Sequence, residues 1–200
     1  QFIWHSFFKW IFLTFVIMDL HYIYSIGHGA KSIEEFAAEL NAFSITHLAD
    51  VRTKPYSGRF PQFNKSALEA TLKTHGIAYI FLGDKLGGLP DDPGCYVDGK
   101  VDYDRIKGKD FFREGLLRLI RAHQNRVKLA VMCSESRPAE CHRTKLIGQE
   151  LLRHGISMQH IISAGRVKPQ ELVINELTKG RASTDLFGNE VSFTSRKTYD

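Results

Sequence analysis

The stretch VKLAVMCSESRPAECHRTKLIGQELLRHG, residues 127–155, decides the fold. Its first six residues are apolar except for Lys128, which predicts a strand over Val127–Met132 of the buried kind found in parallel sheets. The residues from Ala139 to His154 are predicted to form a helix that ends at Gly155. A buried strand that leads into a helix is the first part of the strand–helix–strand unit from which parallel sheets are built.

The same alternation continues on both sides of this stretch. Further strands are expected over Tyr22–Ile26, Ile45–Val51, Ile77–Leu82 and Ile156–Ile161. Further helices are expected over Ser32–Ala42, Lys65–His75, Phe111–Gln124 and Pro169–Lys179. Ser32 and Glu35 form a capping box, Gly76 suits a left-handed helix end, and the segment from Gly83 to about Lys109 is too long for a simple connection. The pattern predicts an α/β fold: one domain, with a largely parallel sheet of about five strands and helices on both faces.

The two ends of the chain differ from this middle part. Residues 1–21 form an apolar N-terminal extension, and the run from Trp10 to Met18 is about half as long as a membrane span. A signal peptide would need a basic start and a small-residue cleavage site, which are not evident. We therefore interpret residues 1–17 as not native and Met18 as the start, with a membrane anchor as the alternative, and expect no stable membrane association. Residues 22–180 are predicted to form the α/β domain, and residues 181–200 to form a polar tail.

Composition fits one folded domain in a reducing compartment. The hydrophobic content of 43% and the charged content of 24% exclude a disordered chain. The three cysteines, none of them in a Cys-x-x-Cys pair, indicate reduced thiols and a cytoplasmic protein. A net charge of +5 permits a phosphate-bearing partner without requiring one.

Chemically distinctive residues follow four of the predicted strands. Ligands of open α/β sheets bind beyond the carboxyl ends of the strands, so we expect these residues to share one site. Gly27–Gly29 follow the first strand, Asp50–Arg52 the second, Leu86–Gly88 come after the third, and Cys133 follows the fourth. The candidate site residues are His28, Asp50, Arg52, Gly87, Gly88, Cys133, Arg137, Cys141, His142 and Arg143.

The segment from Cys133 to Arg143 carries most of the predicted chemistry. A thiol that faces a helix N-terminus close to arginines has a lowered pKa, and the same geometry binds anions. Cys133 or Cys141 is therefore the candidate nucleophile, and an inert buried thiol is the alternative for each. Neighbouring residues of a helix point about 100° apart, so His142 is not expected to act as the base for Cys141, and His28 is the candidate base.

Asp50 is a candidate to orient that base or bind substrate, with an ion pair to Arg52 as its structural alternative. The seven residues between the two cysteines do not match a zinc ribbon, and no nucleotide or dinucleotide motif is present, so no metal and no cofactor is expected. The candidate substrate-binding residues are Arg52, Gly87, Gly88, Arg137, His142 and Arg143.

These residues support two functions of different classes. The first is a cysteine-dependent hydrolase or transferase that acts on a small or nucleotide-like anionic substrate. The second is a non-catalytic module that binds single-stranded nucleic acid, linked to DNA replication or repair. For the second, Tyr56, Phe60 and Phe63 would stack on bases while arginines contact phosphate, although the same aromatic residues could instead pack the loop onto the sheet. A third hypothesis is a ligand-binding domain with buried thiols.

Residues 22–180 resemble the uncharacterised family catalogued as domain of unknown function number 488. The motifs that carry the resemblance are Tyr24–His28 (YSIGH), Asp50–Arg52 (DVR), Pro61–Asn64 (PQFN), Leu86–Gly88 (LGG), and Cys133 with Cys141–Arg143 (CHR). The resemblance implies enzymatic activity at the cysteines and leaves the reaction open. The DVR strand end and the cysteine loop are also similar to rhodanese sulfurtransferases, whose loop closes tightly after its cysteine, whereas this loop carries Glu135, Glu140 and a second cysteine.

The tail contains one further resemblance. Ser183–Phe187 (STDLF) is similar to the short peptide that docks on the bacterial sliding clamp, with Ser183 in place of the usual glutamine. It implies the clamp as a partner, bound through Leu186 and Phe187.

Overall fold

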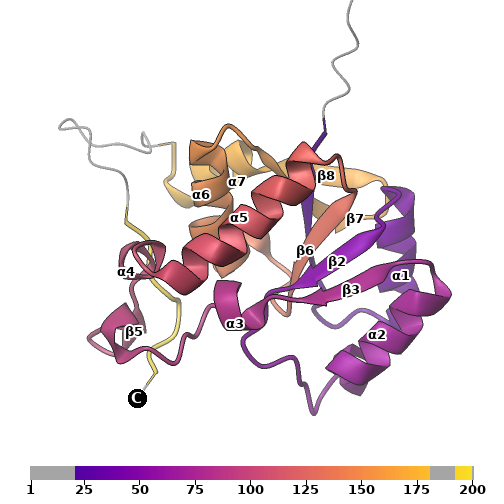
Figure 1. Ribbon diagram of the computed structural model, residues 1–200, viewed down its shortest axis with the longest axis horizontal. Coiled ribbons are helices and arrows are strands. Elements are labelled where there is room, and N and C mark those ends of the chain that lie inside the picture. The colour runs from indigo at the N-terminus through magenta and orange to yellow at the C-terminus, as the bar shows by residue number, and fades with distance from the viewer. Residues whose placement is uncertain (1–20, 181–191, 200) are drawn as a thin grey trace, which may run out of the picture.

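A six-stranded sheet forms the centre of the protein, which a computed structural model describes over residues 21–180 and 192–199 (Figure 1). The order of its strands is β3-β2-β6-β1-β7-β8. Five strands run parallel, and β8 runs antiparallel to β7. The strands are β1 (Ile23–Gly27), β2 (His47–Asp50), β3 (Ala78–Phe81), β6 (Leu129–Cys133), β7 (Met158–Ser163) and β8 (Arg166–Pro169). The predicted α/β class with a largely parallel sheet is confirmed.

Strand β6 is central and lies between β1 and β2. All five of its residues are buried, as its apolar sequence predicts. Gly27 of β1 pairs with Cys133, and Asp50 of β2 pairs with Met132. The three strands therefore end at the same level, and the loops that follow them meet at one edge of the sheet.

Helices cover both faces of the sheet (Figure 1). On one face, α1 (Ile33–Ala42) and α2 (Lys65–Thr74) bury Phe36 and Leu72 against Met132 and its neighbours. On the other face, α5 (Asp110–Gln124) and α6 (Gln149–Arg153) bury Phe112 and Leu151 in a cluster with Val131. Alternate residues of β6 thus belong to different cores, which is the period of two expected of a strand covered on both sides.

Two local predictions about helix ends are confirmed. The hydroxyl of Ser32 accepts a hydrogen bond from the Glu35 amide at 3.1 Å, and the Glu35 carboxylate accepts one from the Ser32 amide at 2.9 Å. This is the capping box, and α1 begins directly after it. Gly76 follows α2 with φ of +70°, a left-handed conformation that glycine adopts without a side-chain clash.

The helix predicted over Ala139–His154 starts too early. Pro138–Glu140 form a separate 3-10 turn (η3), and Cys141 has extended backbone angles, φ −107° and ψ 148°. Only then do a π-helical segment, Arg143–Gly148 (η4), and α6 follow. The buried contacts of Cys141, described below, hold it out of the helix, and sequence periodicity does not register such contacts.

The prediction of about five strands missed β8. This edge strand has only four residues, of which three are Arg, Lys and Pro, so it lacks an apolar signal. It pairs with β7 through a tight turn at Ala164 and Gly165, and the last helix, α7 (Gln170–Leu177), starts directly after Pro169.

The long segment after β3 has its own structure, as its length predicts. It contains α3 (Gly83–Leu86), a 3-10 turn at Pro93–Cys95 (η2), the hairpin β4 (Tyr96–Val97) and β5 (Lys100–Val101), and α4 (Tyr103–Lys107).

Part of the predicted tail packs against this hairpin. The amides of Ser195 and Tyr199 donate hydrogen bonds to the carbonyls of Val101 and Gly99 at 2.9 and 2.6 Å. The predicted N-terminal extension, except residue 21, and the clamp-binding residues Leu186 and Phe187 lie outside the described residues. Within residues 21–180 and 192–199, no helix has both the length and the apolar composition needed to cross a bilayer.

Buried His160 makes the stability of the fold depend on pH. Its ring bonds Ser25 Oγ at 2.6 Å and Gln170 Oε1 at 2.8 Å, and burial lowers its pKa to about 4. Between pH 6.5 and about 4 the unfolded chain binds a proton at this histidine that the folded chain does not. Stability is therefore lost as pH falls through this window, by up to about 3 kcal/mol from His160 alone.

We predict that His160→Gln flattens this pH dependence. Urea unfolding across the window should show a smaller loss of stability in the variant than in the native chain. His154→Gln, at an exposed helix end, is the control and should follow the native curve. Parallel curves for the native chain and His160→Gln would contradict the prediction.

Candidate active site

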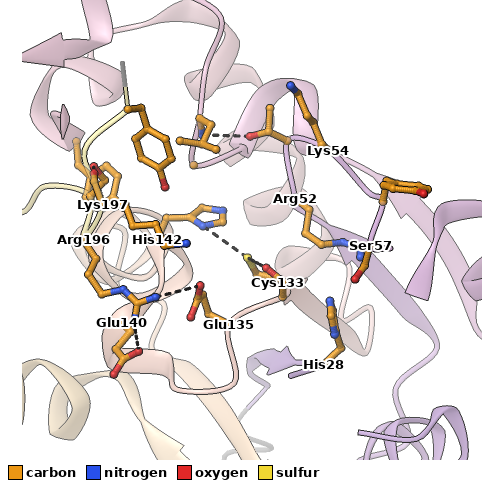
Figure 2. A pocket seen from close by; sticks show the side chains of 18 residues that line it. His28, Arg52, Lys54, Ser57, Cys133, Glu135, Glu140, His142, Arg196 and Lys197 are labelled. Carbon is orange, nitrogen blue, oxygen red and sulfur yellow. Dashed lines mark hydrogen bonds and ion pairs between the residues drawn. The ribbon is translucent and has the colours of Figure 1, made fainter. Parts of the chain in front are cut away.

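A cavity of about 370 Å³ lies where the ends of β1, β2 and β6 meet (Figure 2). Five of the ten predicted site residues line it: His28, Arg52, Gly88, Cys133 and His142. They come from the ends of β1, β2 and β6 and from the segments that follow β3 and β6, so residues from four parts of the chain meet at this cavity.

Cys133 and His142 lie in contact in the wall of this cavity (Figure 2). The Cys133 Sγ atom lies 3.8 Å from Nδ1 of His142, and Nε2 of His142 lies 3.2 Å from the Val51 carbonyl oxygen. Because a carbonyl only accepts hydrogen bonds, Nε2 carries the proton. In the neutral ring, Nδ1 then has a lone pair directed at the thiol, so His142 is placed to accept a proton from Cys133.

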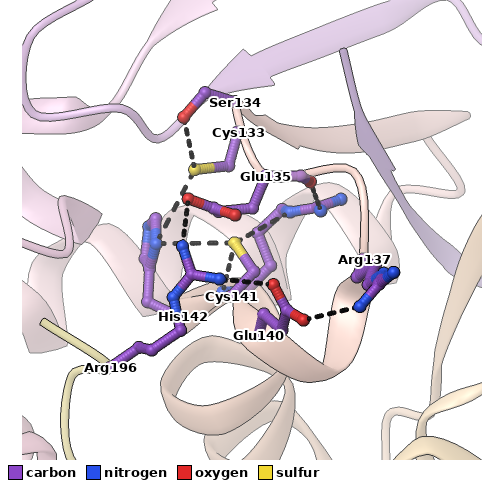
Figure 3. A network of polar contacts seen from close by, with 9 residues as sticks. Cys133, Ser134, Glu135, Arg137, Glu140, Cys141, His142 and Arg196 are labelled. Carbon is purple, nitrogen blue, oxygen red and sulfur yellow. Dashed lines mark hydrogen bonds and ion pairs between the residues drawn. The ribbon is translucent and has the colours of Figure 1, made fainter. Parts of the chain in front are cut away.

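The expectation that His142 cannot face Cys141 is wrong. Its Nδ1 atom lies 3.7 Å from the Cys141 Sγ atom (Figure 3). The argument from helical spacing fails because Cys141 has an extended backbone and is not in a helix.

Arg143 holds the sulfur of Cys141. Its backbone amide and its Nε donate to the Cys141 Sγ atom at 3.5 and 3.2 Å. The same guanidinium donates to Ser25 Oγ at 3.2 Å and to the Glu135 carbonyl at 2.6 Å. Arg143 and Cys141 are both almost fully buried and do not line the cavity.

The two thiols have opposite pKa shifts. For Cys141, burial favours the neutral thiol, but the neighbouring Cys133 thiol and the positive charge of Arg143 outweigh it, and its pKa lies well below the usual value. For Cys133, the neighbouring Cys141 sulfur and burial raise the pKa well above the usual value. The lowered pKa predicted for a thiol near the arginines thus belongs to Cys141, and the cavity thiol of Cys133 carries the proton.

Arg52 and Asp50 form a buried ion pair. Nε and Nη2 of Arg52 donate to the two carboxylate oxygens of Asp50 at 2.9 and 2.6 Å, and Nη2 also donates to the Phe63 carbonyl. Tyr79 donates its hydroxyl to the same carboxylate at 2.8 Å. Asp50 thus forms the ion pair with Arg52 that was the alternative to a role in catalysis or substrate binding. Of these two residues, Arg52 lines the cavity and Asp50 does not. The remaining nitrogen, Nη1, is buried and has no hydrogen-bond partner among the described residues.

His28 is a neutral histidine in the cavity wall. Its ring stacks on Phe63 with centroids 4.2 Å apart, and Nδ1 donates to the Gly29 carbonyl at 2.9 Å. Burial lowers its pKa to about 4. Within the part of the chain that the structure describes, its Nε2 is buried without a partner, and no hydrogen bond joins it to Cys133 or Cys141. Its role as a base remains a prediction.

Besides Arg143, two more predicted substrate-binding residues lie away from the cavity. Arg137 is exposed, with 79% of its side chain accessible, and pairs with Glu140. Gly87 lies behind the wall, where an added Cβ would be 2.4 Å from Thr53 Oγ1. Phe63, expected to stack on bases in the nucleic-acid reading, is fully buried, whereas Tyr56 at the cavity is 74% exposed.

Sequence reasoning missed the wall contributed by the C-terminal residues. Arg196, Lys197 and Tyr199 line the cavity, and Arg196 forms an ion pair with Glu140 at 2.6 Å. No motif marks these residues, because the sequence of a polar tail does not show whether the tail packs on the domain.

These features define an α/β protein with a cysteine and histidine at the end of its central strand, beside a ligand-sized cavity. The chain belongs to the family described as Domain of unknown function DUF488, which matches residues 32–149. No curated protein and no solved structure matches the chain.

Asp50→Asn should destabilise the protein by about 3–5 kcal/mol, because it leaves the Arg52 charge buried without a counter-ion. Asp110→Asn is the matched control, since Asp110 pairs with Arg113 on the exposed surface and should change stability by less than about 1 kcal/mol. Chemical denaturation measures both, and equal small effects would contradict the assignment.

Gly88→Ala should displace the His142 ring, because an added Cβ would lie 2.9 Å from Nδ1. Losing the aligned base should slow iodoacetamide labelling of Cys133 by at least about tenfold. Gly58→Ala is the control, because nothing lies within 4 Å of a Cβ there. Peptide mass spectrometry reads the labelling, and unchanged labelling in Gly88→Ala would show that the ring does not need this space.

Proposed function

We propose that this protein is a cysteine-dependent enzyme, a hydrolase or transferase, that acts on a small anionic substrate with Cys133 as its nucleophile. The observation that carries the proposal is that Cys133 and Arg52 line the same cavity, and that Nη1 of Arg52 is buried without a partner among the described residues.

Arg52 supports an anionic substrate. Its side chain is only 5% exposed, and a buried N–H group without a partner is unfavourable. A carboxylate, phosphate or sulfate oxygen would satisfy Nη1 with a charge-assisted hydrogen bond. Lys54 and Lys197 line the same cavity and add positive charge. A volume of about 370 Å³ suits a small molecule or part of a nucleotide.

The arrangement of Cys133 and His142 supports nucleophilic catalysis. Nδ1 of His142 takes the proton of the Cys133 thiol as the sulfur bonds to the electrophilic atom of the substrate. The bond to the leaving group breaks, the leaving group takes the electron pair, and His142 returns the proton to it. Water then releases the product in a hydrolase, or a second acceptor takes the group in a transferase, and the thiol is restored. Asp50 positions Arg52, and a reducing compartment such as the cytoplasm keeps the thiol free.

The nucleic-acid reading has one supporting observation. Tyr56 is exposed beside Lys54 at the cavity, which suits stacking on a base. Burial of Phe63 removes a second stacking residue, so we rank this function below the enzyme.

The experiment compares two alkylating agents of different charge. An anion site beside the thiol should make negatively charged iodoacetate label Cys133 faster than neutral iodoacetamide, and inorganic phosphate should compete. Arg52→Lys keeps a positive charge against Asp50 but removes the unpartnered nitrogen, and should lower the preference for iodoacetate by about tenfold or more. Arg113→Lys, at an exposed ion pair, should leave it unchanged.

If iodoacetate is the preferred reagent, anionic thioesters, sulfur donors and nucleotides are then screened as substrates. Cys133→Ala should abolish turnover, and Cys95→Ala, outside the cavity, should retain it. The proposal fails if native Cys133 is labelled by neither reagent, if Arg52→Lys leaves the charge preference intact, or if Cys133→Ala retains the activity found.

A further inference from the structure

Three metal-binding atoms converge beside the cavity. They are the Sγ atoms of Cys133 and Cys141 and the Nδ1 atom of His142, and all lie within 4.8 Å of one another (Figure 3). All three residues are buried. Two thiolates and an imidazole are the ligands that zinc prefers.

The distances match those of a tetrahedral site. Zn–S bonds of about 2.3 Å and Zn–N bonds of about 2.0–2.1 Å place sulfur and nitrogen about 3.6 Å apart. Here Nδ1 of His142 lies 3.8 Å from the sulfur of Cys133 and 3.7 Å from that of Cys141. The two sulfur–nitrogen separations therefore lie within about 0.2 Å of the tetrahedral value. The two sulfur atoms lie within 4.8 Å of each other, and around one tetrahedral ion they would sit about 3.8 Å apart.

The surrounding hydrogen bonds are those that support a metal site. Nε2 of His142 donates to the Val51 carbonyl, which leaves Nδ1 free as a ligand and fixes the ring. The two N–H groups of Arg143 that donate to Cys141 hold its sulfur in place. Gly88 packs so closely on the His142 ring that a methyl group there would lie 2.9 Å from Nδ1.

We propose that Cys133, Cys141 and His142 bind one Zn²⁺ ion, with the fourth coordination position open to the cavity. Cys133 and His142 line that cavity, whereas Cys141 completes the site from behind. The spacing of the cysteines in the sequence does not predict this site, because the ligands come together only where the extended Cys141 returns toward the end of β6.

Zinc at this position would regulate the proposed reaction. It would occupy the sulfur of Cys133 and the nitrogen of His142, so the nucleophile and its base would both be blocked. This consequence rests on the proposed function, whereas zinc binding itself does not.

Binding is tested on the full chain, freed of metal, by titration with Zn²⁺ alone against a chromophoric chelator. We expect one ion per chain with a Kd below about 1 μM. Co²⁺ in place of zinc should give a thiolate-to-metal charge-transfer band. Cys141→Ser and His142→Gln should each weaken binding by about 100-fold or more. Cys95→Ala should bind like the native chain, since Cys95 lies outside the site.

Circular dichroism of the metal-free variants shows whether they fold. If Cys141→Ser does not fold, Cys133→Ala, at the cavity surface, is measured in its place. Absence of stoichiometric zinc binding in the folded native chain, or zinc binding unchanged in both His142→Gln and Cys133→Ala, would overturn the site.

Iodoacetate labelling of the same preparations separates the two proposals. Both proposals are supported if Cys133 is labelled in the metal-free chain and zinc suppresses this labelling. Normal labelling without zinc binding overturns the metal site alone. Zinc binding to a chain whose metal-free Cys133 does not react supports the site and overturns the nucleophile. Labelling that continues at saturating zinc overturns the role of Cys133 as a ligand.

Discussion

The buried guanidinium of Arg143 is the constraint on which the site depends. It is among the largest fully buried side chains, and a charged group in such a place needs acceptors on all sides. It finds them in Ser25 of β1, the Glu135 carbonyl and the sulfur of Cys141. These contacts join the first strand, the loop after β6 and the start of the following helix. They also explain why Cys141 stays extended, with its sulfur turned inward instead of carried around a helix.

Arg52 is a second buried arginine, and its hydrogen bonds differ from those of Arg143. Arg52 is neutralised by Asp50 at the end of β2 and lines the cavity, yet among the described residues its Nη1 atom has no hydrogen-bond partner. Arg143 donates to Ser25, Glu135 and Cys141, whereas within residues 21–180 and 192–199 one nitrogen of Arg52 has no acceptor. The candidate site thus combines a rigid part, which sets the positions of the sulfurs and the imidazole, with a buried donor that we propose is satisfied by an anion. This donor is the strongest physical argument that the cavity has a ligand.

The two proposals share one cluster and describe two states of it. Without metal, the proton of Cys133 lies within reach of His142, and a substrate held by Arg52 would meet a thiol next to a base. With zinc, the same atoms become ligands and the thiol is no longer free. Both states use the lone pair of the His142 Nδ1 atom, and the hydrogen bond from Nε2 to the Val51 carbonyl selects the neutral tautomer that offers it.

The sequence by itself determined the class of fold, the succession of the main strands and helices along the chain, and the edge of the sheet at which the candidate site lies. Those features depend on local signals, such as the apolar run of β6, the capping box at Ser32 and the glycine after α2, and on the general rule that parallel strands end at one edge. Only the tertiary structure decided that His142 faces both cysteines, that Arg52 keeps a free donor while Arg137 points into solvent, and that Arg196 and Lys197 complete the cavity. These features depend on contacts between residues far apart in the chain and on which buried groups find partners, and neither periodicity nor motif spacing records them.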